Sequence, residues 1–406
     1  MATEHLIINY RTTILLFIGF ITRLTLGIYI TLRLVSLDKY GITPEVAMII
    51  VSFSMVIGII INIPSGFFSD KYGHKLCTII GFLFRVLGIS LLLGFNSIFS
   101  VILSFSLYAI GLSLDDGAFK AWLIQDNIDN SDFIRRINIT IAHMSTISLL
   151  LGAFIGSILL DMNSQFPWFF IFIFDLFAFM LSLFVKGNIK CETQNTILNT
   201  YKNIKNTFLY LFKDISLRSI IIIDIFMFFY LGFLLAGIYP YFNEAFSNKV
   251  FARIGFVQLS FSLGFLIGNF LVQHFRNNNS IILRIYNIYP FFNILICILP
   301  LLNLSPVLIL LVIFLRCILT PFYRITMNSV FDIALRKHEE IRVSAYSVRE
   351  IIASISVALA MFLAGNFGGY PYVGIWVAAI AFSVLYPIVL YFLQRGNFCL
   401  KTIYYS

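Results

Sequence analysis

Long apolar runs recur along the whole chain, and they limit what it can fold into more than any other feature. Each run holds about twenty residues, the length that an α-helix needs to cross the hydrocarbon core of a bilayer. Hydrophobic residues make up 60% of the 406 positions, charged residues only 12%, and the mean hydropathy is +0.93. The sequence therefore predicts an integral membrane protein rather than a set of soluble domains.

Twelve such runs can be counted, and we expect each to form one membrane-spanning helix. Their predicted bounds are 12–35, 44–66, 75–95, 97–120, 137–160, 167–186, 217–241, 252–272, 281–302, 305–326, 342–365 and 371–394. The polar stretch 187–216 divides them six and six. This pattern predicts an all-α membrane protein with a six-helix bundle over 1–186, a cytoplasmic linker over 187–216 and a second six-helix bundle over 217–406.

The basic residues predict which side of the membrane each loop faces. If both termini are cytoplasmic, most of the 28 Lys and Arg residues fall in the inner loops, the linker and the two tails. The outer loops then hold only Lys39, Lys249 and Arg253. The net charge of +9 reflects this topology and attraction to anionic lipid, and no basic patch interleaved with aromatic residues points to nucleic acid.

A polar stretch between the second and third runs has the pattern G-x-x-x-D-x-x-G-x-K, formed by Gly66, Asp70, Gly73 and Lys75. Gly66 would let two helices approach closely, and Gly73 can adopt the positive φ that ends one helix before the next begins. The carboxylate of Asp70 would be favoured near helix N-termini. Flanked by membrane spans, the stretch resembles the loop between the second and third helices of the major facilitator superfamily of secondary transporters.

A second segment, 339–347, lies ahead of the eleventh run and is similar to the E-x-R-A-x-x-x-S stretch of the equivalent loop in that family. The resemblance implies that Arg342 and Asp70 belong to one cytoplasmic gate, together with Gly66, Gly73 and Lys75. Ordinary ion pairing between charged loops is the alternative.

Glycines at a spacing of four occur in the fifth and eighth runs. The segment 152–157 resembles the G-P-x-x-G-G run of proton-driven drug exporters in a bacterial branch of the superfamily, although Ala153 replaces the proline and Ser157 replaces the last glycine. Gly152 and Gly156 in that run, like Gly264 and Gly268 in the eighth, would let helix backbones pack closely. The resemblance implies packing between the two bundles; packing inside one bundle is the alternative.

Charged residues inside the apolar runs are the candidates for substrate and proton chemistry. An ionisable group at the bilayer centre costs from about 2.5 to more than 10 kcal/mol, so it normally faces a cavity or a partner. The resemblance places the first, fourth, seventh and tenth runs around a central cavity. Each of these runs carries a charge, and the residues concerned are Arg23, Asp115, Asp116, Asp224 and Arg316.

We expect Asp115 or Asp116 to exchange the coupling proton, because adjacent residues of a helix point about 100° apart and only one would reach the cavity. Asp224 is the second candidate. Arg23 and Arg316 would hold an anionic group of the substrate or neutralise these acids, and fixed salt bridges such as Arg23 with Asp115 are the alternative. Arg85 and Asp175, on spans usually peripheral to the cavity, are expected to be structural and paired.

The resemblance implies a secondary transporter that works by alternating access in a bacterial inner membrane. It also implies a monomer, since most relatives of this type act alone. We expect proton-coupled export, by antiport, of a small amphipathic compound such as a drug, an antibiotic or a toxic metabolite, with a role in resistance or self-immunity. Import of a nutrient or metal chelate is the alternative, and a membrane receptor or enzyme is an alternative of another class. Dispersed Cys and His residues and the lack of a Walker sequence predict no catalytic residues, metal site or cofactor.

Overall fold

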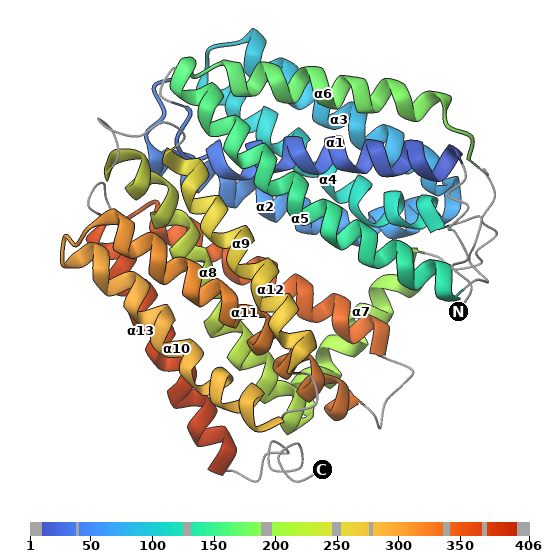
Figure 1. Ribbon diagram of the computed structural model, residues 1–406. Helices are drawn as coiled ribbons and strands as arrows, with labels where there is room; N and C mark the ends of the chain where they lie inside the picture. The colour runs from blue at the N-terminus through green and yellow to red at the C-terminus, as the bar shows by residue number, and fades with distance from the viewer. Residues whose placement is uncertain are drawn as a thin grey trace. The chain divides into compact units, whose positions relative to one another are not determined.

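The chain is all-α over the residues that the structure describes, namely 10–37, 40–124, 131–187, 197–245, 253–275, 279–335, 342–367 and 372–395 (Figure 1). In this computed structural model they form thirteen helices. The helices are α1 (Tyr10–Leu32), α2 (Pro44–Tyr72), α3 (His74–Gly94), α4 (Ile98–Ile124), α5 (Ser131–Met162), α6 (Phe166–Phe184), α7 (Ile197–Lys213), α8 (Ile215–Ala245), α9 (Arg253–His274), α10 (Asn279–Leu301), α11 (Pro306–Leu335), α12 (Arg342–Ala364) and α13 (Val373–Arg395).

Eleven helices in the described part of the chain are long and apolar enough to cross a membrane. The apolar segment Val373–Ile388 of α13 is shorter, and α7 lies within the predicted linker. The expectation of an all-helical, multi-pass membrane protein is confirmed, whereas the count of twelve crossings stays a prediction.

Contacts between residues divide the chain into two compact units. Unit 1 comprises Met1–Gly41 and Ile57–Asn195, and unit 2 comprises Ile42–Val56 and Thr196–Ser406. The division passes through α2, whose first residues belong to unit 2.

The two units repeat one pattern of helix pairing. In unit 1, α1 packs against α5 and α6, and α3 packs against α4 and α6. In unit 2, α8 packs against α12 and α13, and α10 packs against α11 and α13. Since α8 to α13 follow one another in the same order as α1 to α6, each unit pairs its first helix with its fifth and its third helix with its fourth.

Glycines bring corresponding helices of the two units into backbone contact. A Cβ added to Gly27 of α1 would overlap the carbonyl oxygen of Leu149 in α5. A Cβ added to Gly232 of α8 would lie 2.8 Å from the carbonyl oxygen of Val357 in α12. Both pairs are therefore held at a separation that a larger side chain would not permit.

Candidate functional site

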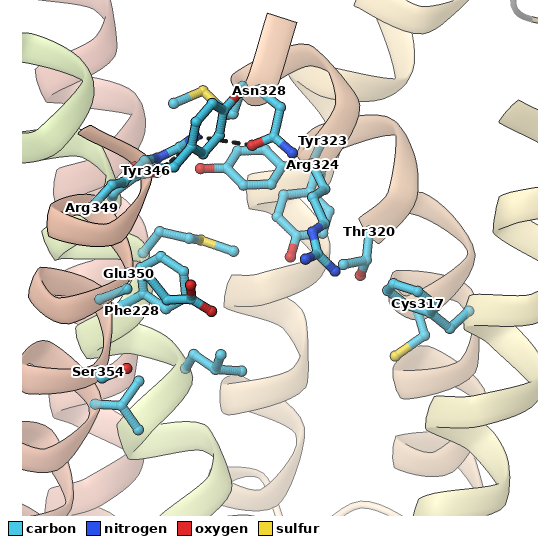
Figure 2. Close-up of a pocket in the computed structure, with 18 of the residues that line it drawn as sticks. Phe228, Cys317, Thr320, Tyr323, Arg324, Asn328, Tyr346, Arg349, Glu350 and Ser354 are labelled. Atoms are coloured by element: carbon cyan, nitrogen blue, oxygen red, sulfur yellow. Dashed lines mark hydrogen bonds and ion pairs between the residues drawn. The ribbon is translucent and has the colours of Figure 1, made fainter. Parts of the chain in front are cut away.

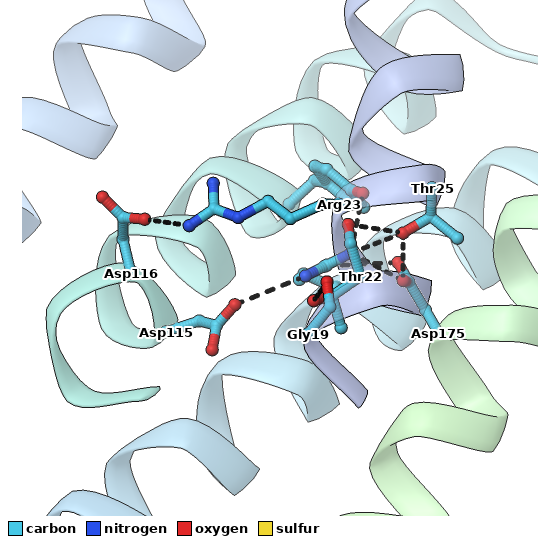
Figure 3. A network of polar contacts seen from close by, with 9 residues as sticks. Gly19, Thr22, Arg23, Thr25, Asp115, Asp116 and Asp175 are labelled. Carbon is cyan, nitrogen blue, oxygen red and sulfur yellow. Dashed lines mark hydrogen bonds and ion pairs between the residues drawn. The ribbon is translucent and has the colours of Figure 1, made fainter. Parts of the chain in front are cut away.

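A buried arginine links four helices of unit 1. Arg85 of α3 is 1% exposed, and its guanidinium lies 2.6 Å from Asp175 of α6 and 3.5 Å from Asp115 of α4. It also donates hydrogen bonds to the Thr25 hydroxyl of α1 at 2.8 Å and to the Tyr108 hydroxyl of α4 at 3.3 Å. Figure 3 shows how the two acids and Thr25 converge on this point. The expected Arg85–Asp175 pair is confirmed, and Asp115 joins it.

Two glycines leave the space that this arrangement needs. A Cβ on Gly111 of α4 would lie 2.7 Å from Cγ of Arg85, and a Cβ on Gly81 of α3 would lie 2.8 Å from the carbonyl oxygen of Gly111. α3 and α4 therefore approach at backbone distance, which lets the arginine reach acids on both of its neighbours.

The cluster contains one more acid than base. Both oxygens of Asp175 accept hydrogen bonds from Arg85, and one also accepts from Thr25 at 2.7 Å. Asp115 is 8% exposed, and its Oδ1 is buried with no hydrogen-bond partner among the described residues. If both acids were ionised, the cluster would hold an uncompensated negative charge, which costs several kcal/mol in a buried site. One proton on Asp115 would remove that charge and leave the Arg85–Asp175 pair intact.

The neighbouring acid has a different partner. Asp116 lies 2.5 Å from Arg23 of α1, and the two side chains are 70% and 33% exposed (Figure 3). The fixed bridge considered as the alternative, Arg23 with Asp115, is wrong, because rotation along α4 turns Asp115 toward α3 and Asp116 toward Arg23. An exposed pair of this kind contributes about 0–1 kcal/mol to stability.

Unit 2 buries an ion pair of its own. Arg349 of α12 holds both oxygens of Asp224 of α8, with nitrogen–oxygen distances of 2.5 and 3.2 Å. The same guanidinium donates to Asn328 of α11 at 2.9 Å and lies 4.6 Å from the ring centre of Phe331. The charge of Asp224 is therefore matched by Arg349, and the pair ties α8, α11 and α12 together.

A cavity of about 640 Å³ lies beside this pair within unit 2 (Figure 2). Its charged wall residues are Asp224, Arg316, Arg324, Arg349 and Glu350. Tyrosine, phenylalanine and methionine side chains form much of the remaining wall. Arginines outnumber acids on the wall, and the cavity can accept an apolar body as well as a charged group.

The most deeply buried arginine on this wall is Arg316 of α11, which is 4% exposed. Its Nε donates to the side-chain oxygen of Asn293 in α10 at 3.0 Å. The guanidinium lies 5.8 Å from the ring centre of Tyr230 and 5.2 Å from that of Tyr289. Within the described part of the chain it forms no ion pair with an acid. Arg316 is therefore a buried positive charge that no carboxylate of the described residues in unit 2 compensates.

Comparison with known proteins gives the family. The model of the Major Facilitator Superfamily matches residues 15–339, which is more than half of the chain. The chain belongs to the major facilitator superfamily. It is therefore a multi-pass membrane transporter, in agreement with its apolar helices.

Solved transporters of known structure share the fold. The nucleoside transporter NupG superposes with a TM-score of 0.72 at 14% identity, covering 95% of this chain and 99% of its own. A POT family transporter in complex with 5-aminolevulinic acid gives 0.72 at 14%, covering 95% and 96%. At this identity the likeness concerns the fold alone. An uncharacterised MFS-type transporter of Bacillus subtilis, YxaM, is 26% identical over 148 residues, which are 36% of this chain and 37% of that protein.

The superfamily-like stretch 66–76 is almost entirely helical. α2 continues to Tyr72 and α3 begins at His74, so that Gly73, with φ of 96°, is the whole connection. The expected positive φ of Gly73 is confirmed. A Cβ at Gly66 would meet no described atom within 4 Å, so close helix approach at this glycine stays a prediction. The side chains of Asp70 and Arg342 lie outside the described part of the structure, so their gate stays a prediction.

Lys75 has an anchoring contact inside unit 1. Its ammonium donates to the carbonyl oxygen of Leu183 at 3.2 Å, at the C-terminal end of α6, where a helix favours a positive charge. Gly187 packs against the side chains of Lys75 and Trp122. A Cβ added to Gly187 would lie 2.9 Å from Cβ of Lys75 and 2.9 Å from the indole nitrogen of Trp122. Lys75 therefore holds the end of α6 and the start of the connector to unit 2.

The four glycines predicted to pack between bundles pack inside their own units. A Cβ on Gly152 would overlap the carbonyl oxygen of Leu24 in α1, and one on Gly156 would lie 2.8 Å from Cγ2 of Ile28. Gly264 and Gly268 of α9 face α11 in the same way. This is the packing inside one bundle that the sequence left as the alternative, while packing between the bundles stays a prediction.

The structure brings together some of the predicted site residues and separates others. Asp224 and Arg316 both line the cavity of unit 2, whereas Asp115 is buried against Arg85 and Asp116 is exposed with Arg23. Sequence reasoning missed Arg349, Asn293 and Asn328 as partners of these charges. The only available signal was an arginine inside the eleventh run that had been assigned no acid.

Proposed function

We propose that this chain is a proton-coupled secondary transporter that moves a small amphipathic compound by alternating access. The observation that carries this proposal is the excess acid of the buried cluster around Arg85. Asp115 can take up a proton there while the Arg85–Asp175 pair stays intact. A group that is neutral with a proton and uncompensated without one can link protonation to the energy of two conformations.

The proposal includes the arrangement expected from the sequence. Two six-helix bundles, 1–186 and 217–406, would move against each other as a monomer of twelve crossings in a bacterial inner membrane, with both termini cytoplasmic. The repeated order of helix pairing supports two bundles of equal construction. Export of a drug, antibiotic or toxic metabolite is the proposed direction, supported by the likeness of 152–157 to the exporter run.

Reconstitution in vesicles with an imposed pH gradient tests this function. We expect at least one compound of a broad panel to move when the gradient is present and to stop moving when it is collapsed. Movement of the compound opposite to the proton flow is expected for export by antiport. Movement in the same direction as the proton flow would instead indicate import. If no compound in the panel moves with the gradient, the proposed proton coupling to an amphipathic compound is contradicted.

Two single variants test the assigned acid. Asp115→Asn should reduce gradient-driven accumulation to the level seen without a gradient, because the cluster can no longer gain a proton. Asp116→Asn removes the exposed partner of Arg23 and should keep gradient dependence. Thermal unfolding of both purified variants checks that they are folded. Unchanged coupling in a folded Asp115→Asn protein would remove Asp115 from the mechanism.

A further inference from the structure

Arg316 is a buried arginine that has no carboxylate partner among the described residues. A guanidinium removed from water costs several kcal/mol unless an anion or a full set of acceptors compensates it. Among the described residues, Arg316 donates a hydrogen bond to Asn293 and lies over two aromatic faces, Tyr230 and Tyr289. Aromatic faces offset only part of what a buried charge loses on leaving water. The wall of the cavity therefore carries a cation in need of a partner.

Nearby acids do not supply that partner. Asp224 is held at both oxygens by Arg349. Glu350, the other carboxylate on the cavity wall, belongs to α12 and is exposed, and within the described residues no ion pair joins it to Arg316. Arg324, a third cation of the wall, adds to the positive balance. The field in the cavity therefore favours an anion over a cation or a zwitterion with a leading ammonium group.

Unused hydroxyl groups lie beside this cation. Tyr289 and Tyr323 line the cavity, are 0% and 8% exposed, and stack with ring centres 4.8 Å apart. Their hydroxyls make no hydrogen bond among the described residues. A buried hydroxyl without a partner is costly, and each of these can donate to an oxygen of a ligand. The stacked rings beside them offer a flat apolar surface.

We infer that this cavity binds an organic oxyanion, whose charged group is held by Arg316 and the hydroxyls of Tyr289 and Tyr323 and whose aromatic or apolar body lies along the cavity wall. A planar guanidinium matches a carboxylate or a phosphate by paired hydrogen bonds. The inference rests on the proposed function in that it names the class of compound transported. The same oxyanion chemistry is offered by a soluble carboxylate and by a lipid phosphate, and the experiment separates these sources.

Thermal unfolding of the purified full chain in detergent tests binding without any gradient. The probes are benzoate, indole acetate and naphthoate, each compared with its neutral amide. A ligand that binds only the folded protein raises the unfolding temperature, and at saturating concentration we expect at least one carboxylate to raise it by about 2 °C or more while its amide does not. If no carboxylate stabilises the protein more than its amide, the inference is overturned. This comparison needs no variant.

Variants then locate the site. Arg316→Gln should abolish the difference between carboxylate and amide, and Arg316→Lys, which keeps the charge but not the paired geometry, should weaken it. The control is Arg33→Gln: Arg33 follows directly after α1 and is also an arginine over a tyrosine, 5.6 Å from the ring centre of Tyr29, but it lies in unit 1. It should leave the difference unchanged. A carboxylate effect that survives Arg316→Gln would place the anion elsewhere and overturn the assignment.

Phosphatidylglycerol added to the detergent forms a further arm. Stabilisation by this lipid alone, lost in Arg316→Gln and matched by no carboxylate, would assign the cavity to lipid phosphate and overturn its role with a soluble compound. Binding of a carboxylate without gradient-driven movement would leave this inference standing and contradict the proposed function. Gradient-driven movement of neutral compounds only would support the proposed function and contradict this inference.

Discussion

Each unit buries an arginine, but the two arginines have opposite surroundings. Arg85 in unit 1 faces two acids, Asp115 and Asp175, whereas Arg316 in unit 2 faces an amide and two tyrosine rings. The first cluster is one negative charge in excess when ionised, and the second is one positive charge in excess. Two units with the same order of helix pairing can therefore have buried clusters of opposite net charge. The first would be neutralised by a proton and the second by an anion.

The difference also shows what the repeated packing does and does not determine. Arg85 lies on the third helix of its unit and Arg316 on the fourth of its own, so the charges do not follow the helix repeat. The backbone contacts at Gly27 and Gly232 do follow it. The close helix packing at these glycines is thus the same in both units, whereas the positions of the buried arginines differ.

The largest expected effect concerns the charge balance itself. Arg85→Met leaves Asp175 buried without its partner and should lower the free energy of unfolding by about 3–5 kcal/mol. Arg316→Met removes a charge that has no acidic partner and should cost much less, or stabilise the protein. Thermal unfolding in detergent without added ligand measures both. Equal destabilisation by the two variants would show that the comparison drawn here is wrong.

A second test concerns the compensated pair of unit 2. Asp224→Asn leaves Arg349 partly unpaired in a largely buried position and should cost about 3 kcal/mol. Adding Arg349→Gln removes the remaining charge, so the double variant should recover a substantial part of the loss. A double-mutant cycle on unfolding free energies gives the coupling. Additive losses would mean that the two side chains stabilise the unit independently, which the bidentate contact does not predict.

Backbone packing should be alike in the two units even though the charges differ. Gly152→Ala in α5 and Gly264→Ala in α9 each force a Cβ against a neighbouring helix, and we expect each to cost about 1–3 kcal/mol. Gly66→Ala is the matched control, because its added Cβ meets no described atom and alanine favours a helix by about 0.5–1 kcal/mol. Loss of stability in Gly66→Ala would indicate a contact that unit 1 alone does not contain.

The smallest expected effect is at the exposed pair of unit 1. Arg23→Gln removes the partner of Asp116 and should change the free energy of unfolding by about 1 kcal/mol or less. Raising the salt concentration should reduce the difference further, because exposed charges are screened. A loss as large as that of Arg85→Met would place Arg23 in the buried cluster.

The helical membrane fold could be predicted from the sequence, because runs of high hydropathy indicate membrane-spanning helices. The ends of the helices were predicted less accurately. The second run was predicted to stop at residue 66, but α2 continues to Tyr72, since polar residues can extend a helix beyond the apolar part. The turn at Gly73 was correctly predicted because a positive φ is the one conformation that glycine adopts more easily than other residues.

The candidate site could be predicted only in part from the sequence. Arg85 and Asp175 could be paired from the sequence, since two opposite charges inside apolar runs need each other. Which of Asp115 and Asp116 would be buried depends on the rotation of α4 relative to α3, and no local pattern records that rotation. The neighbours of Gly152 and Gly264 inside their own units could likewise not be named from the sequence, because glycine spacing shows that a helix packs closely but not which helix it meets.

The position of Gly187 has a consequence for how the two halves communicate. The connector leaves unit 1 pressed between Lys75 and Trp122, and Lys75 stands two residues after the single-glycine turn between α2 and α3. One lysine side chain thus contacts both the last described residue before the connector and the end of α6, and it stands beside the turn of the segment that resembles a gate.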